Sequence, residues 1–83
     1  MNKENSLIEI GNFIKNLRIK NKLSIEKLAY KSDISYALLH RIEKGTINTS
    51  IFTFFKLLSN LNCNTDDMCT LLVNVFSKSK EIN

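Results

Sequence analysis

The stretch SIEKLAYKSDISYALLHRIEKG, residues 24–45, decides the fold, because it contains two short helical segments with almost nothing between them. Ser24 and Ser35 each have the position of an N-cap, with apolar residues on either side at the spacing of a hydrophobic staple. Gly45 is placed to end the second segment in a left-handed conformation. The turn at 32–35 is too short for the two helices to fold back alongside each other, so we expect them to cross steeply.

Apolar residues recur at helical spacing before and after this stretch. Ser6 and Glu9 have the form of a capping box that begins a first helix, and Ser50 can cap a fourth. Residues 65–78 form a fifth, with acidic residues in its first turn. The residues of the fourth segment that we expect to point inward are Ile51, Phe54, Phe55, Leu58 and Leu61. The sequence therefore predicts an all-α fold of five short helices in a single domain over residues 1–83.

Composition supports helices and points to a polyanionic partner. The 83 residues include no proline and two glycines, which disfavours turn-rich β folds. The net charge of +4 lies entirely in residues 1–48, which hold nine Lys or Arg and five Asp or Glu, whereas residues 49–83 hold three of each sign. A one-sided basic half is typical of proteins that bind nucleic acid. No apolar run approaches the ~20 residues of a membrane span and no export-signal pattern opens the chain, so we expect a cytoplasmic protein.

Residue types that would carry catalysis or bind metal are scarce. Cys63 and Cys69 lie six positions apart, and His40 is the one histidine of the chain, so no zinc-site spacing exists. Both cysteines are interpreted as small apolar packing residues. Because no Gly-rich phosphate loop and no acid or nucleophile accompanies the histidine, we expect no enzyme activity, no cofactor and no small-molecule ligand.

The helix that follows Ser35 has two faces of opposite character. With 3.6 residues per turn, Leu39 and Ile42 point to the core. The opposite face has hydrogen-bond donors and no acid, as a helix that reads the major groove requires. Its residues are Tyr36, Ala37, His40, Arg41 and Lys44. Two alternatives remain open from the residues alone, since Tyr36 could pack on the rim of the core and His40 could be merely solvated.

Several motifs in this order resemble one family. They are Leu-Arg near the end of the first helix, Leu-Ser-x-x-x-Leu-Ala in the second, Ile-Ser at the turn and Arg-Ile-Glu-x-Gly at the end of the third. Over about residues 10–68 the sequence resembles the lambda-repressor/Cro-like, or XRE, helix-turn-helix family. The resemblance implies a five-helix DNA-binding domain with the helix-turn-helix at about 24–45. It also implies a restriction-modification controller protein or a small phage-type repressor, and the LAYKSDIS stretch favours the controllers.

The resemblance also implies roles for individual residues. Base contacts would come from Tyr36, Ala37 and Arg41, with His40 close by. Phosphate contacts would involve Ser24, Ile25, Ser35, Lys44, Thr46 and Asn48. Arg18 and Glu43 match a salt bridge between the first and third helices, which makes Arg18 structural and not a DNA contact.

Three residues depart from the family pattern. Asp33 stands where the turn usually has glycine, and Asp tolerates a left-handed backbone better than most residues. Ile25 replaces a polar residue that often donates to phosphate, so that contact would pass to backbone amides at the helix N-terminus. Lys27 stands where a glutamate would complete a capping box.

The fifth helix is apolar on two sides. One stripe, expected to close the core, is Met68, Leu71, Leu72 and Val75; the other is Cys69, Val73 and Phe76. The second stripe predicts an isologous contact between the fifth helices of two copies, alone or together with part of the fourth helix. The sequence therefore predicts a homodimer that binds double-stranded DNA at a palindromic operator and regulates transcription, since two recognition helices ~34 Å apart read successive major grooves. The alternative is a protein-interaction module, antitoxin-like or anti-repressor-like, that has lost DNA binding.

Overall fold

The computed structural model describes residues 3–80 of the chain and is all-α over that range, as the sequence predicts. Residues 1–2 and 81–83 of the expected domain lie outside the described residues. The five helices are α1 (Lys3–Lys20), α2 (Ile25–Lys31), α3 (Tyr36–Lys44), α4 (Ile51–Ser59) and α5 (Thr65–Lys80).

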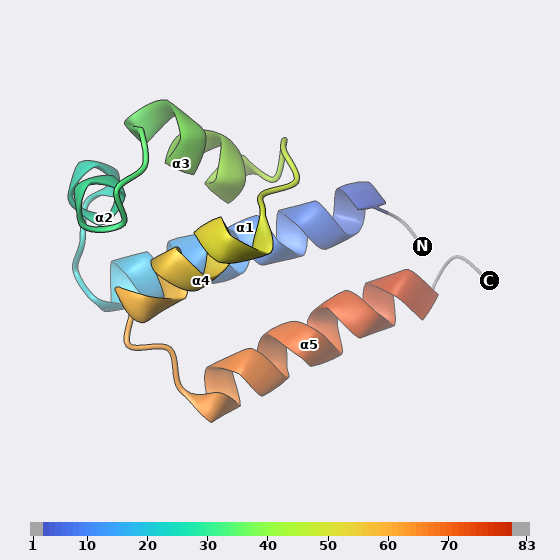
Figure 1. Ribbon diagram of the computed structural model, residues 1–83. Coiled ribbons are helices and arrows are strands. Elements are labelled where there is room, and N and C mark those ends of the chain that lie inside the picture. The colour runs from blue at the N-terminus through green and yellow to red at the C-terminus, as the bar shows by residue number, and fades with distance from the viewer. Residues whose placement is uncertain (1–2, 81–83) are drawn as a thin grey trace.

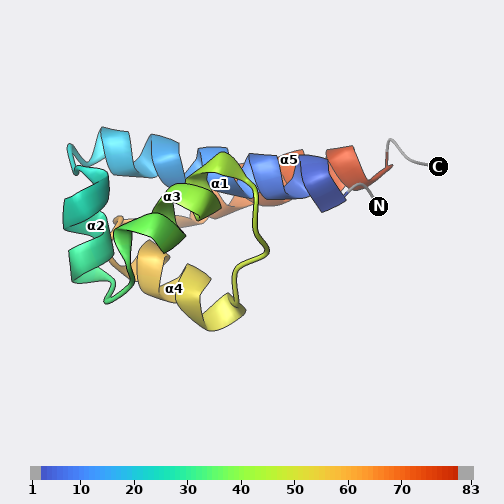
Figure 2. The same ribbon diagram turned by 90° about the horizontal axis from the view of Figure 1, so that it is seen from above.

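Helix α1 is the centre of the arrangement. It packs against α3 on one side and α5 on the other, and α1 and α5 run beside each other (Figure 1). The view from above shows α2 lying across the direction of α1 and α3, which is the steep crossing expected from the short turn (Figure 2). Helix α4 lies next to the α2–α3 pair and completes the small core.

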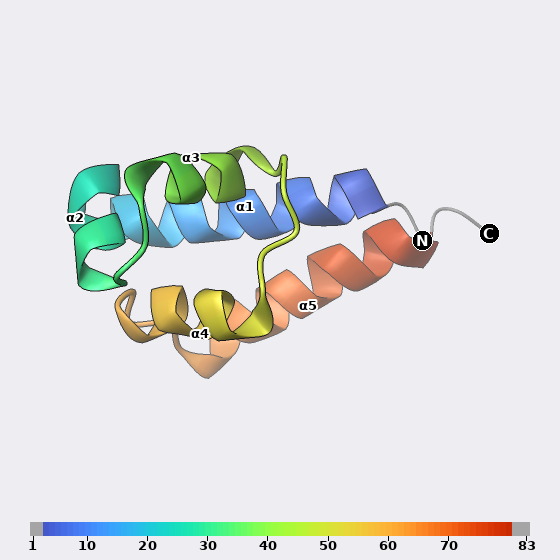
Figure 3. The same cartoon turned by 45° about the horizontal axis from the view of Figure 1, so that its top comes forward.

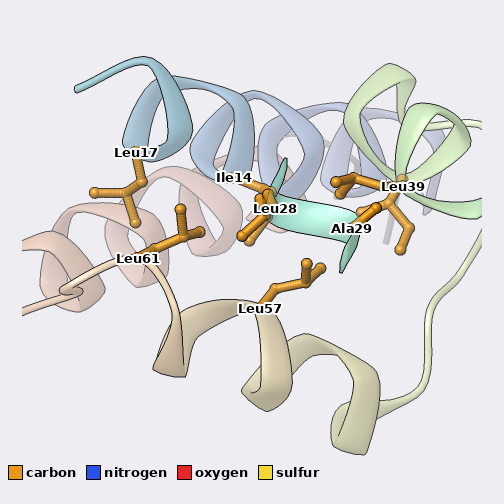
Figure 4. Close-up of a cluster of buried hydrophobic side chains, with 8 residues drawn as sticks. Ile14, Leu17, Leu28, Ala29, Leu39, Leu57 and Leu61 are labelled. Carbon is orange, nitrogen blue, oxygen red and sulfur yellow. The ribbon is translucent and has the colours of Figure 1, made fainter. Parts of the chain in front are cut away.

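The core consists of apolar side chains from the first four helices and of Leu61, which lies just after α4. Ile14, Leu28, Leu39 and Leu57 are fully buried at its centre (Figure 4). The rest of the cluster is Leu17, Ala29, Ile42 and Leu61. Burial of each large aliphatic side chain contributes about 1.5–3 kcal/mol. Because the cluster takes residues from both α2 and α3, it fixes the helix pair as a unit.

The start of α1 differs from the sequence prediction. The helix begins at Lys3, so Ser6 lies inside it and is buried, and the capping box expected at Ser6 and Glu9 is wrong. Lys3 and Glu4 are good helix formers, and they extend the helix upstream of the expected cap.

The start of α5 is as expected at Thr65, but the cap is one residue earlier. The side-chain oxygen of Asn64 accepts a hydrogen bond from the Asp67 amide (2.8 Å), and the Asn64 amide donates to the Asp67 carboxylate (3.2 Å). This reciprocal pair satisfies two groups that the helix itself leaves unpaired.

The inward faces expected for α4 and α5 are partly wrong. Leu57 is the fully buried residue of α4, whereas Ile51 and Phe55 are 68% and 56% exposed. In α5, Leu71 is buried but Leu72 is 62% exposed. The apolar stripes on both helices are wider than the core that one protomer offers, so their edges remain uncovered.

Candidate nucleic-acid interface

Each of the two helices of the helix–turn–helix unit is capped at its N-terminus by a serine side chain. The Ser24 hydroxyl oxygen accepts from the Lys27 amide (3.1 Å), and that of Ser35 accepts from the Leu38 amide (3.0 Å). Asp33 has φ of 56°, so the residue in the glycine position of the turn adopts the expected left-handed conformation. Each serine oxygen acts here as an acceptor, which leaves the hydroxyl proton to donate outward.

Helix α3 is anchored on one side and exposed on the other. Leu39 and Ile42 are buried in the core, and Gly45, with φ of 72°, ends the helix as a left-handed cap. Ala37, Arg41 and Lys44 on the opposite side are all exposed. The helix therefore presents two cations and a small side chain on one solvent-facing strip.

Tyr36 and His40 lie one turn apart on this strip and stack on each other. Their ring centroids are 6.0 Å apart and the rings are inclined by 11°. Tyr36 is half exposed, so it does not pack into the core, and His40 is half-buried. Each ring limits the freedom of the other, so the pair forms a flat, ordered surface at the N-terminal half of α3.

Arg18 and Glu43 come together as a two-pronged ion pair between α1 and α3. Arg18 Nε donates to Glu43 Oε2 (2.7 Å), and Arg18 Nη2 donates to Glu43 Oε1 (3.0 Å). The remaining Arg18 nitrogen, Nη1, donates to the carbonyl of Leu23 (2.9 Å). All three guanidinium nitrogens are thus engaged inside the protein, and Arg18 points away from the exposed strip of α3.

The other residues expected near phosphate are placed as follows. Ser24 and Ser35 are exposed at the helix starts, whereas Ile25 is half-buried and packs against the core. Thr46 and Asn48 are exposed in the segment that links α3 to α4, seen along its length in Figure 3. Sequence reasoning missed a second role of Thr46, whose amide (3.1 Å) and hydroxyl (3.2 Å) both donate to the carbonyl of Arg41.

The outer flank of α5, defined here as Cys69, Val73 and Phe76, is exposed in the protomer. Of the two cysteines expected to be apolar packing residues, Cys63 is half-buried against the core, whereas Cys69 is exposed on the stripe expected to contact a second copy. Burial raises the pKa of the Cys63 thiol above its ordinary value, and the negative charge of Asp67 adds to the shift.

Residues 3–80 have neither a membrane-spanning helix nor a cluster of metal-binding side chains. None of the five helices is both long and apolar enough to cross a bilayer. No group of three or more His, Cys, Asp or Glu side chains in this range is arranged to hold a metal ion.

Comparisons with known proteins agree on the architecture. A family model described as helix-turn-helix matches residues 14–68. The restriction-modification controller protein C.AhdI from Aeromonas hydrophila is 28% identical, with a TM-score of 0.68 over 74% of this chain and 92% of that one. The clp gene regulator ClgR from Corynebacterium glutamicum is 16% identical and shares the fold, with a TM-score of 0.76 over 92% of this chain and 82% of that one. No curated protein matches by sequence.

Proposed function

We propose that this chain, which belongs to the helix-turn-helix family of DNA-binding transcriptional regulators, binds a palindromic operator as a homodimer. Helix α3 is the recognition helix in this proposal and lies in the major groove. The similarity to a restriction-modification controller protein supports the same role here, in preference to that of a phage-type repressor.

The exposed strip of α3 is the observation that carries the proposal. A helix buried on one side through Leu39 and Ile42 enters a groove as a rigid rod. The one carboxylate of this helix, on Glu43, is turned inward and held by Arg18. No acid of α3 is therefore exposed on the strip that would face DNA, whereas Arg41 and Lys44 are exposed on it.

Roles follow from position on this surface. Arg41 is the principal base-reading residue, because its planar guanidinium matches the two acceptors of guanine. Ala37 allows close approach, and the stacked pair of Tyr36 and His40 reads bases beside it. The residues assigned to phosphate are Ser24, Ile25 through its backbone, Ser35, Lys44, Asn48 and Thr46, whose hydroxyl rotates away from the Arg41 carbonyl to do so.

Replacing Arg41 with alanine is expected to weaken binding to the selected operator by about 1–3 kcal/mol and to relax sequence preference at one base pair. The operator is obtained by selecting bound sequences from a random DNA pool, which should return a palindrome. Lys44→Ala is the matched control, since loss of a phosphate contact lowers affinity for all sequences alike. An equal loss on every sequence for Arg41→Ala would make Arg41 a phosphate contact and remove its base-reading role.

Salt dependence distinguishes DNA binding from the rival function of a protein-interaction module. Operator affinity should fall steeply with salt, with a log–log slope of about −0.9 for each phosphate neutralised. Binding measured by fluorescence anisotropy between low and moderate salt gives this slope directly. Absence of salt-dependent binding to any DNA in the selected pool would favour the module that has lost DNA binding.

A further inference from the structure

A cleft of about 240 Å³ lies between α1 and α5. Its lining includes three apolar side chains, Phe13 and Leu17 from α1 and Leu71 from α5. Leu17 and Leu71 are buried, and Phe13 is half-buried against the core, so these three form the floor. The other seven lining residues are polar or charged, so the cleft has an apolar floor between polar walls.

Four uncharged polar side chains line the walls, two from each helix. Asn12 and Asn16 are four residues apart on α1, and Thr70 and Asn74 are four residues apart on α5. Residues at this spacing lie on the same face of a helix, so each pair follows its own side of the cleft. All four residues are exposed. The cleft therefore has two facing rows of groups that can form hydrogen bonds with a ligand.

The three asparagines in these rows have no hydrogen-bonding role in the fold. Asparagine is a poor residue for a helix interior, because its side chain competes for backbone hydrogen bonds. Elsewhere the chain uses it at helix ends, where Asn64 caps α5 and Asn60 bonds to the carbonyl of Lys31. Within residues 3–80, the side chains of Asn12, Asn16 and Asn74 make no hydrogen bond to another protein group. Their carboxamides are therefore available to a ligand.

The spacing of the rows matches the backbone of an extended peptide. A carboxamide has both a donor and an acceptor, as a peptide group has. Four residues of helix rise by about 6 Å and two residues of extended chain by about 6.6 Å, so Asn12 and Asn16 can bond alternate peptide groups. The Thr70 hydroxyl donates to the carbonyl of Asp66 (3.0 Å), so its oxygen can accept from a peptide N–H.

Charged residues mark the two ends of the cleft. Glu9 and Lys20 lie on the same face of α1 about 16 Å apart along the helix axis, a distance that about five extended residues span. Glu9 is half-buried and forms no ion pair within residues 3–80, so this end favours a cationic group. Asp67 lies towards Lys20 and balances it, because α1 and α5 run in opposite directions (Figure 1).

We propose that this cleft binds an extended peptide of about five residues with a basic group at one end. The two polar rows hold the peptide backbone, and alternate side chains of the peptide rest on the apolar floor. The basic group, either the peptide amine or a Lys or Arg side chain, lies beside Glu9. Because α3 packs on the other side of α1, a bound peptide leaves the exposed strip of α3 uncovered (Figure 1). Peptide binding at this site does not depend on DNA binding.

Selection from a phage-displayed library of random heptapeptides, with the full chain as target, supplies a ligand for the test. We expect the selected sequences to share apolar residues at alternate positions and a basic residue at one end. Methylating the amide nitrogens of a selected peptide one at a time then tests backbone recognition. Affinity, measured by fluorescence anisotropy, should fall about tenfold at alternate positions and change little between them, because each methyl group removes one N–H donor.

A variant with one asparagine removed from each wall locates the binding site. Asn16→Ala/Asn74→Ala should raise the dissociation constant of the selected peptide at least about tenfold, because two hydrogen bonds are lost. Alanine is the better helix former, so circular dichroism should show the variant folded as before. Lys15→Ala/Ser77→Ala is the matched control, since both residues are exposed on the same helices outside the cleft. It should leave the dissociation constant unchanged.

Three outcomes would overturn the proposal. The first is a selection that enriches no peptide. The second is an enriched peptide whose affinity is the same for Asn16→Ala/Asn74→Ala as for the unmodified chain, since its site would lie elsewhere. The third is a methylation series that lowers affinity at every position or at none, because an extended backbone held at alternate peptide groups predicts a period of two.

Discussion

Replacing Arg18 with methionine should lower the free energy of unfolding by about 3–5 kcal/mol, the loss typical when one member of a buried ion pair is removed. The Glu43 side chain is only 4% exposed and Arg18 is 12% exposed, so water cannot replace the lost guanidinium. Methionine keeps the unbranched apolar stem of arginine, which confines the change to the charge and its hydrogen bonds. A domain of this size has a total stability of roughly 4–12 kcal/mol, so the loss would remove from about a quarter to the whole of it.

Denaturant unfolding followed by circular dichroism measures this loss. Lys15→Met on the exposed side of α1 serves as the matched control and should change stability by less than about 0.5 kcal/mol. A double variant, Arg18→Met with Glu43→Leu, should recover most of the stability, because an apolar pair leaves no unpaired charge. A loss below about 1 kcal/mol in Arg18→Met would mean that the pair behaves as an ordinary surface salt bridge.

The Arg18–Glu43 ion pair also bears on the proposed DNA binding. Glu43 belongs to the recognition helix, and the pair turns its carboxylate away from the DNA-facing strip. The double variant therefore separates stability from binding, since it also removes the acid from α3. If it folds and binds the operator as the unmodified chain does, the role of the pair is purely to join α1 and α3.

Features set by neighbouring residues could be predicted from the sequence. The caps at Ser24 and Ser35 and the left-handed residues Asp33 and Gly45 depend on atoms within about three positions, which the sequence displays directly. The exposed strip of α3 likewise follows from helical periodicity once Leu39 is assigned to the core.

Features set by long-range packing could not be predicted in the same way. Ile51, Phe55 and Leu72 have the same apolar character and spacing as true core residues, and only the placement of α4 and α5 leaves them exposed. Ser6 has the sequence pattern of an N-cap but lies inside α1, because the helix formers before it extend the helix upstream. The capping pattern alone does not show where the helix begins. Periodicity defines the direction of an apolar face but not how much of that face a neighbour covers.

Replacing Gly11 with alanine should destabilise the fold by about 3 kcal/mol, although helix propensity alone predicts a gain of up to about 1 kcal/mol. A methyl group on Gly11 would meet the carbonyl oxygen of Ile42 and lie 2.6 Å from that of Glu43. Both obstacles are backbone atoms at the end of α3, where the Ile42 side chain is in the core and Glu43 is in the ion pair. Neither can move without breaking those contacts, so the steric cost exceeds the gain in propensity.

Asn12→Ala provides the matched control for this substitution. Asn12 is exposed on the same turn of α1, so alanine there should bring the propensity gain with no clash and leave the fold at least as stable. Thermal unfolding should show a lower melting temperature for Gly11→Ala and an unchanged or higher melting temperature for Asn12→Ala. A stabilised Gly11→Ala protein would mean that α1 and α3 stand further apart than the backbone contact at Gly11 requires. The end of α3 and the α3–α4 link would then have room to shift, and the position of Arg41 on the DNA-facing strip would no longer be fixed by this crossing.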